Sequence, residues 1–126
     1  MVLRESNLTG GIINAATKVH SALGPGLLES AYEACLAYEL VVRGFAVNKQ
    51  VAMPLVYEGV RLDIGYRIDL IVDRKVLIEV KAVSEIAPVH AAQVLSYLKL
   101  SGLRIGLLLN FHVVSFKHGI KRFVLD

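Results

Sequence analysis

Two acidic residues and a lysine stand at a spacing that could carry out metal-assisted chemistry. Asp69 lies in the run YRIDLIV, and Glu79 and Lys81 lie in VLIEVK, with a short polar turn between the runs. If the two runs form a hairpin in which Val72 pairs with Val76, Asp69 falls opposite Glu79. Carboxylates about 5 Å apart repel by roughly 3 kcal/mol at an effective dielectric near 20. A divalent cation between them turns this repulsion into attraction, so the pattern predicts a magnesium or manganese site.

The cations of the same hairpin fit a phosphodiester substrate. Lys81 ends its strand, at the edge where open α/β sheets gather their ligands, and its charge could orient an attacking water. Arg67, opposite Lys81 in this register, could hold a phosphate. Three alternatives remain open: both acids on a solvated sheet face, Lys81 as an ordinary edge lysine, and Arg67 as an ion-pair partner of the acids.

The elements that must position these groups follow from the apolar spacing. The hairpin strands are predicted over residues 66–72 and 76–81, with one apolar face formed by Ile68, Leu70, Val72, Val76, Ile78 and Val80. Helical spacing predicts helices over residues 8–23 and 27–43, the second with a core stripe of Leu28, Ala31, Cys35 and Leu36. Strands are expected over residues 45–55 and 56–62, with a turn near Glu58-Gly59.

The second half of the chain predicts a helix between two strands. Pro88 opens a helix that runs to residue 101, and the apolar strand 105–110 follows it. A helical crossover makes this strand parallel to strand 76–81. Residues 113–125 are expected to form a closing hairpin that turns at His118-Gly119. Residues 1–126 are therefore predicted to form a single α/β domain with a mixed central sheet flanked by helices.

Further candidate site residues lie on the helices and in the tail. His90, Gln93 and Tyr97 share one stripe of the third helix, opposite a core side of Ala91, Val94, Leu95 and Leu98. This stripe could overhang the acids, where Gln93 could fix a water or a phosphate oxygen and Tyr97 could stack or donate a hydrogen bond. The alternative is that the stripe is an ordinary half-exposed helix face. The cations of the tail could grip a phosphate backbone or could line a solvated hairpin end: Lys117, Lys121 and Arg122.

Composition limits the class of protein without defining its activity. The chain has 126 residues, 55% of them hydrophobic, which suits one domain with one core. Its net charge of +3 permits an anionic partner such as nucleic acid. No apolar run reaches transmembrane length, so no membrane association is expected. Cys35 is the only cysteine, which excludes an intrachain disulfide and fits a cytoplasmic location.

The sequence also resembles a known family. The segment GLLESAY, residues 26–32, is similar to the motif that names the GxxExxY proteins, a branch of the PD-(D/E)XK nuclease superfamily. The likeness extends to VHSALGPGLLESAYE, GYRIDLIVDRKVLIEVKA, PVHAAQVLSYLKLSG and GLLLNF…GIKRFVL, in that order. The resemblance implies the restriction-endonuclease-like fold, with helices flanking a mixed central sheet. Where the superfamily has Pro-Asp, this chain has Ile68-Asp69, a common departure.

The resemblance also implies roles for individual residues. Asp69 and Glu79 match the metal-binding acids, Lys81 the catalytic lysine, and the carbonyl of Val80 the backbone ligand. Glu29, which spacing alone places in a first helical turn where the dipole favours a carboxylate, would be the acid from the leading helix. Gln93 and Tyr97 match the Q-x-x-x-Y helix motif of the RecB-like nucleases.

The expected function is therefore hydrolysis of phosphodiester bonds in nucleic acid, with DNA as the expected substrate and Mg²⁺ or Mn²⁺ as the cofactor. The alternative is a catalytically inactive module of the same fold that serves nucleic-acid binding or protein assembly. The chain offers no separate DNA-reading element, so substrate choice could come from a homodimer or a partner protein.

Overall fold

The computed structural model describes residues 5–126, in which a twisted central sheet lies between two layers of helices. In chain order the elements are α1 (Ser6–Leu23), α2 (Glu29–Val42), β1 (Val47–Ala52), β2 (Leu55–Tyr57), β3 (Val60–Leu62), β4 (Arg67–Val72), β5 (Val76–Lys81), α3 (Pro88–Ser101), β6 (Ile105–Asn110), the 3-10 helix η1 (Phe116–Gly119) and β7 (Ile120–Val124). The central sheet has five strands in the order β1-β4-β5-β6-β7, and β2 and β3 form a separate two-stranded sheet. The predicted α/β fold with a mixed sheet is confirmed.

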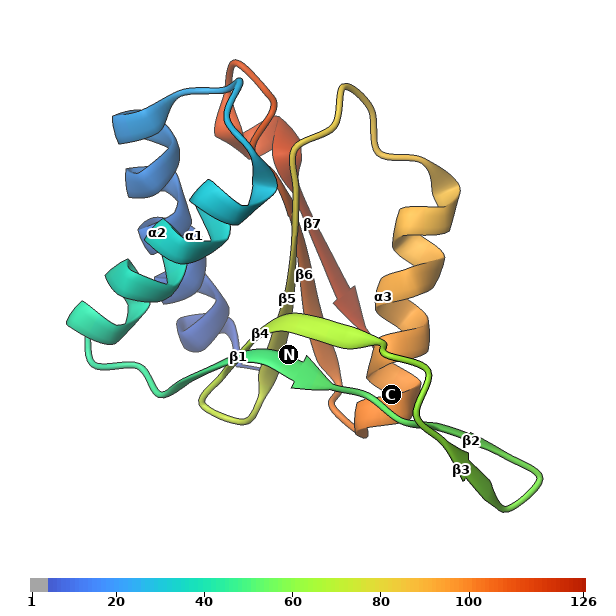
Figure 1. Cartoon of the computed structure of the whole chain (residues 1–126). Coiled ribbons are helices and arrows are strands. Elements are labelled where there is room, and N and C mark those ends of the chain that lie inside the picture. Colours follow the sequence, from blue (N-terminus) through green and yellow to red (C-terminus); the bar gives the residue numbers. More distant parts are fainter. Residues whose placement is uncertain (1–4) are drawn as a thin grey trace.

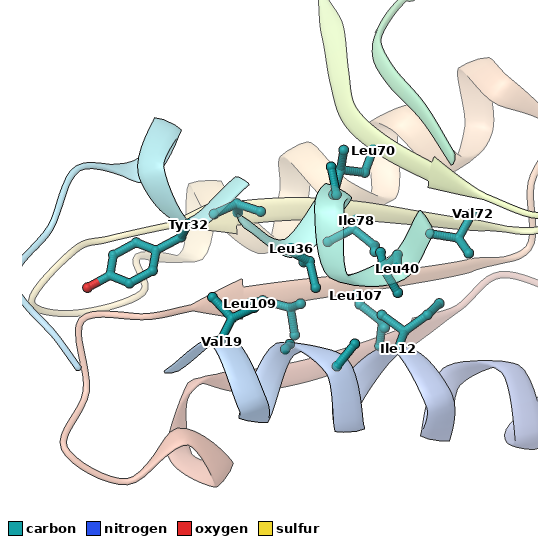
Figure 2. Packing of buried hydrophobic residues seen from close by; sticks show 14 of the residues in the cluster. Ile12, Val19, Tyr32, Leu36, Leu40, Leu70, Val72, Ile78, Leu107 and Leu109 are labelled. Carbon is teal, nitrogen blue, oxygen red and sulfur yellow. The ribbon is translucent and has the colours of Figure 1, made fainter. Parts of the chain in front are cut away.

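The helices divide between the two faces of the sheet. Figure 1 shows α1 and α2 together on one side and α3 on the other. The larger buried cluster joins α1 and α2 to the sheet and includes Ile12, Leu36, Leu40, Ile78 and Leu107, which meet side by side in Figure 2. A smaller cluster lies under α3. Burying both sheet faces explains why β6, the strand beside β5, is apolar from Ile105 to Leu109.

The predicted hairpin register is correct near the turn and ends before the acidic residues. Val72 pairs with Val76, and the ladder between β4 and β5 continues only to Leu70 opposite Ile78. Beyond that pair the expected backbone pairing of Asp69 with Glu79, and of Arg67 with Lys81, is absent from the described strands. The two strands part at this point, which leaves room for side chains between them.

The predicted apolar face of the hairpin is wrong at one residue. Ile68 belongs to the cluster under α3, whereas Leu70, Val72 and Val76 belong to the cluster under α1 and α2. Strict alternation would put Ile68 on the same side as Leu70. Strand β4 therefore turns over at Asp69, between these two residues.

The parallel pairing of β5 with β6 is confirmed, from Val76 opposite Ile105 to Lys81 opposite Asn110. Two other strand predictions are wrong. Residues 55–62 form not one strand but a small hairpin of β2 and β3, which turns at the expected Glu58-Gly59. In the tail, residues 116–119 form η1 rather than a hairpin arm, because β7 pairs antiparallel with β6 instead.

Three predicted core positions on the helices are also wrong. In α2 the core side carries Tyr32, Leu36, Ala37 and Leu40, whereas Leu28 precedes the helix and Cys35 is exposed. In α3 Leu95 is exposed and Tyr97 takes the buried position. Both helices are largely apolar on several sides, so local spacing did not decide which side would meet the sheet.

Candidate metal centre

The carboxylate of Asp69 occupies the gap where β4 and β5 part. Its Oδ2 accepts a hydrogen bond of 2.8 Å from the backbone N–H of Val80. Its Oδ1 accepts one of 3.3 Å from Nε2 of Gln50 on β1. The side chain thus takes the place of a missing ladder bond, and both of its oxygens are oriented by neighbouring strands.

Glu79 is the most unusual group of this site, because it is an acid with only 3% of its surface exposed. Its Oε1 is buried without a hydrogen-bond partner in the described part of the chain. Burial is the largest cause that raises the pKa of Glu79 to about 9, followed by hydrogen bonding with the Asp69 carboxyl and then by its charge. The charge of Lys81 opposes this rise. A buried acid with an orphaned oxygen beside a second acid is a donor set that suits a cation.

Val80 presents its backbone to the same gap. The N–H and C=O of a strand residue leave the strand on the same side, and the N–H of Val80 points to Asp69. The carbonyl of Val80 therefore faces the acids as well, whereas the Lys81 carbonyl bonds Phe111 on the opposite side. Lys81 itself is half-buried, on the same face of β5 as Glu79. Arg67 is exposed at the start of β4 and forms no ion pair within the described residues.

The start of α2 brings further acids to this edge of the sheet. Oε2 of Glu29 accepts a hydrogen bond of 3.3 Å from the N–H of Ala82, directly after β5. One turn later, Glu33 accepts a bond of 2.7 Å from Gln50. Burial raises the pKa of Glu33, a bond from Gln50 lowers it, and the charges of Asp69 and Glu29 raise it again. Glu33 and Gln50 were not predicted from the sequence, and nothing in their local spacing singles them out.

The third helix approaches the acids from the other face of the sheet. Nε2 of Gln93 donates to the hydroxyl of Tyr97 over 3.4 Å. Burial raises the pKa of Tyr97, and the charge of Glu79 raises it next, so Tyr97 stands close to the acids. His90 accepts a hydrogen bond at Nδ1 from the N–H of Ala87 over 3.0 Å, which fixes the start of α3.

The predicted tail cations do not lie together. Lys117 is exposed on η1, whereas Lys121 and Arg122 lie on β7. Lys121 on β7 is paired with Leu108 on β6, and Leu108 is paired with Glu79 on β5. The Lys121 side chain therefore projects from the same sheet face as Glu79, two strands or about 10 Å away. Arg122 is the next residue and projects from the other face.

Two residues with no role predicted from the sequence, Tyr32 and Asn110, hold the backbone around the site. Tyr32, the tyrosine of GLLESAY, is fully buried; its hydroxyl donates to the Gly24 carbonyl over 2.5 Å and accepts from the Leu27 N–H over 3.1 Å. It thereby ties the α1–α2 loop to the helix start that carries Glu29. Asn110 accepts from the Val83 N–H and donates to its carbonyl, which fixes the chain after Lys81. The position of Asn110, a polar residue at the end of an apolar strand, was the feature of the sequence that could have indicated its role.

The geometry is thus a pair of acids with a backbone carbonyl and a lysine, rather than a preformed carboxylate cage. Within residues 5–126, no three His, Cys, Asp or Glu side chains are grouped so as to hold a metal ion. Asp69 and Glu79 come together, and Glu29 stands apart at Ala82.

A mixed sheet flanked by helices, with Asp and Glu-x-Lys on its central hairpin, defines a nuclease-like fold. A family model described as the PD-(D/E)XK nuclease superfamily matches residues 6–123. The chain belongs to this superfamily. Comparisons with curated proteins and with solved structures returned no match. Across the described residues, no helix combines the length and apolarity needed to cross a bilayer.

Proposed function

We propose that this protein is a divalent-metal-dependent nuclease that hydrolyses phosphodiester bonds, with DNA as its substrate. The observation that carries the proposal is the buried Glu79 carboxyl, whose Oε1 has no partner in the described chain while Asp69 stands beside it. Such an oxygen destabilises the metal-free protein, and a cation is the group that would satisfy it. Membership of a nuclease superfamily supports the same conclusion.

The residues that would hold Mg²⁺ or Mn²⁺ are Asp69, Glu79 and the carbonyl of Val80, with Glu29 contributing directly or through a water. When bound, the ion supplies an acidified water and charge stabilisation for the phosphoryl oxygens. Lys81, half-buried near Glu79, orients the water and stabilises developing negative charge. Gln93 and Tyr97 limit the site on the α3 side, where the hydroxyl of Tyr97 accepts from Gln93 and keeps its own proton for donation.

The surface on which the substrate would lie is on the α3 side of the acids. A hollow of about 420 Å³ lies between α3 and the β2–β3 hairpin, lined by residues that include Tyr66, His90, Gln93 and Tyr97. The rings of Tyr66 and Tyr97 meet edge to face, 6.3 Å apart. Aromatic walls of this kind suit nucleotide bases, and Arg67, which is exposed next to Tyr66, would contact a phosphate. Lys121 shares the sheet face of Glu79 and would extend this contact, whereas Lys117 and Arg122 would act farther along a strand.

Metal titration of the purified protein tests the proposal. Mn²⁺ or Mg²⁺ at about 100 times its dissociation constant should stabilise the wild type by about 2.7 kcal/mol, seen as a higher melting temperature. Asp69→Asn should lose this gain. Lys81→Ala should keep it and lose cleavage of end-labelled DNA. An unchanged melting temperature of the wild type in the presence of either ion would refute the proposal.

Substrate class is tested in the same assay with matched DNA and RNA oligonucleotides, single- and double-stranded. Cleavage of RNA alone would refute DNA as substrate and leave the metal centre standing. Metal binding with no cleavage of any oligonucleotide would instead favour the non-catalytic alternative, a nuclease-fold module for nucleic-acid binding or assembly. Protein mass measured by light scattering in the presence of each oligonucleotide shows whether a homodimer forms.

A further inference from the structure

Strand β1 is irregular at one residue, Gln50. Its pairing with β4 runs from Val47 opposite Val72 to Lys49 opposite Leu70, and resumes at Val51 opposite Ile68. The skipped position is Gln50 opposite Asp69. Gln50 has a φ of 50°, in the left-handed region that residues other than glycine rarely adopt. Such a conformation costs on the order of 1 kcal/mol, so other interactions must hold it in place.

The irregularity has a consequence for both strands. Val47 packs against the cluster under α1 and α2, whereas Val51 packs against the cluster under α3. Ile68 and Leu70 on β4 are divided in the same way. In a regular strand, Val47 and Val51, which are four residues apart, would lie on one face, and so would Ile68 and Leu70, which are two apart. The strand pair therefore turns over at the Gln50–Asp69 position, and the turn-over brings the Gln50 amide to the acids.

The side chain of Gln50 joins two carboxylates. Its Nε2 donates over 2.7 Å to Oε2 of Glu33 and over 3.3 Å to Oδ1 of Asp69. The Val80 N–H already holds Oδ2 of Asp69, so Gln50 supplies the second support of that carboxylate. An amide suits this place because it supplies two donors and no charge. A lysine or arginine here would neutralise the acids and compete with a cation.

Stability alone does not account for a glutamine at this position. Gln50 is exposed, so water competes for its hydrogen bonds, and the strain of its left-handed backbone offsets part of what they contribute to stability. If only a left-handed backbone were needed, glycine would supply it without that strain and asparagine with less of it. The length of the glutamine side chain is what lets it reach both acids.

We propose that Gln50 is a positioning residue of the metal centre, which orients Asp69 for cation binding and links it to Glu33 as a further acid of the same site. The proposal rests on the proposed metal-dependent function. Outer groups that orient a ligand typically change metal affinity by about 10–100-fold when they are removed.

Gln50→Asn is the sharpest test. Asparagine tolerates the left-handed backbone and keeps the amide, but it is one methylene, about 1.5 Å, shorter and cannot bridge both acids. Calorimetric titration should show Mn²⁺ binding about tenfold weaker than in the wild type, with an unchanged or higher melting temperature of the metal-free protein. Gln50→Gly should behave in the same way. Asn48→Ala, an exposed change on the same strand, should alter neither quantity.

The outcomes separate the positioning role from the function itself. Equal Mn²⁺ affinity in wild type, Gln50→Asn and Gln50→Gly would overturn the positioning role and leave the nuclease proposal intact. A lower melting temperature of both metal-free variants with unchanged affinity would assign Gln50 a purely structural role and would also overturn it. Absence of Mn²⁺ binding in the wild type would overturn the proposed function, and the role of Gln50 with it.

Discussion

Replacement of Glu79 by glutamine should stabilise the metal-free protein and remove much of the dependence of its stability on pH. Glutamine has the shape of the protonated acid and cannot ionise. Glu79 is 3% exposed, and its Oε1 lacks a partner among the described residues, so the folded protein disfavours the ionised form. The variant therefore imitates the protonation state that the fold prefers.

The magnitude follows from the difference in pKa between the two states. The pKa of Glu79 is raised from 4.5 to about 9 in the folded protein, chiefly by burial. Between these values the folded state holds a proton that the unfolded state has released, so stability falls as pH rises. The slope is about 1.4 kcal/mol per pH unit, which amounts to about 3 kcal/mol between about pH 5.5 and about pH 8. The contribution is fully present below the unfolded pKa and is lost as pH rises through the folded pKa.

Urea unfolding in a chelator, measured across this pH range for wild type and Glu79→Gln, tests the reasoning. Other groups titrate in both proteins, so the quantity to compare is the difference in unfolding free energy at each pH. That difference should grow with pH in favour of Glu79→Gln. Saturating Mn²⁺ should stabilise the wild type most at high pH, because a metal ligand must be ionised, and should not stabilise the variant in this way. Parallel pH profiles for the two metal-free proteins would refute the assignment of Glu79 as a buried, protonated acid.

Four further outcomes are expected from urea unfolding. Tyr32→Phe should lower the free energy of unfolding by about 1–3 kcal/mol, because the Gly24 carbonyl and the Leu27 N–H lose their hydrogen-bond partner. Tyr38→Phe, at an exposed site, should leave it unchanged. Equal effects of the two substitutions would contradict the role of the Tyr32 hydroxyl. Gly119→Ala should lower the free energy of unfolding by about 1–3 kcal/mol or more, because the added Cβ would clash with the Asn110 carbonyl. Gly10→Ala, on α1 where the added Cβ meets nothing, should raise it by about 0.5–1 kcal/mol. Leu36→Ala should cost about 2–5 kcal/mol in the cluster under α1 and α2, and a value near zero would show that this cluster is not packed as described. Asn110→Ala should lower the free energy of unfolding by about 1–3 kcal/mol, because Asn110 Oδ1 accepts hydrogen bonds from the N–H groups of Val83 and His112. The rate of amide hydrogen exchange at these two N–H groups should rise. Unchanged exchange rates would contradict these hydrogen bonds.

The sequence by itself was enough to predict the elements with strong local signals. Pro88 and Gly102 bound α3 as expected, and the apolar run 105–110 is the fully covered strand β6. The pairing of Val72 with Val76 followed from a short turn between two alternating runs. These features depend on neighbours in sequence, so periodicity and turn residues are sufficient to indicate them.

The residue types of the candidate site were also visible in the sequence, but their environment was not. Asp69, Glu79 and Lys81 were singled out by spacing, whereas the burial of Glu79 follows from the layers that cover β5 on both faces. Counting residues along a hairpin predicted facing carboxylates across a continuous ladder. In the structure the ladder ends at Leu70, and Asp69 bonds the Val80 backbone instead.

Tertiary structure alone decided which distant residues share the site. Gln50 and Glu33 reach Asp69 because β1 and β4 turn over together, and Tyr32 holds the α1–α2 loop from within the core. The same long-range packing left Cys35 exposed and moved Ile68 to the α3 side. The pattern of one strand cannot show where its neighbour stops pairing, because that point is set by contacts between segments far apart in the chain.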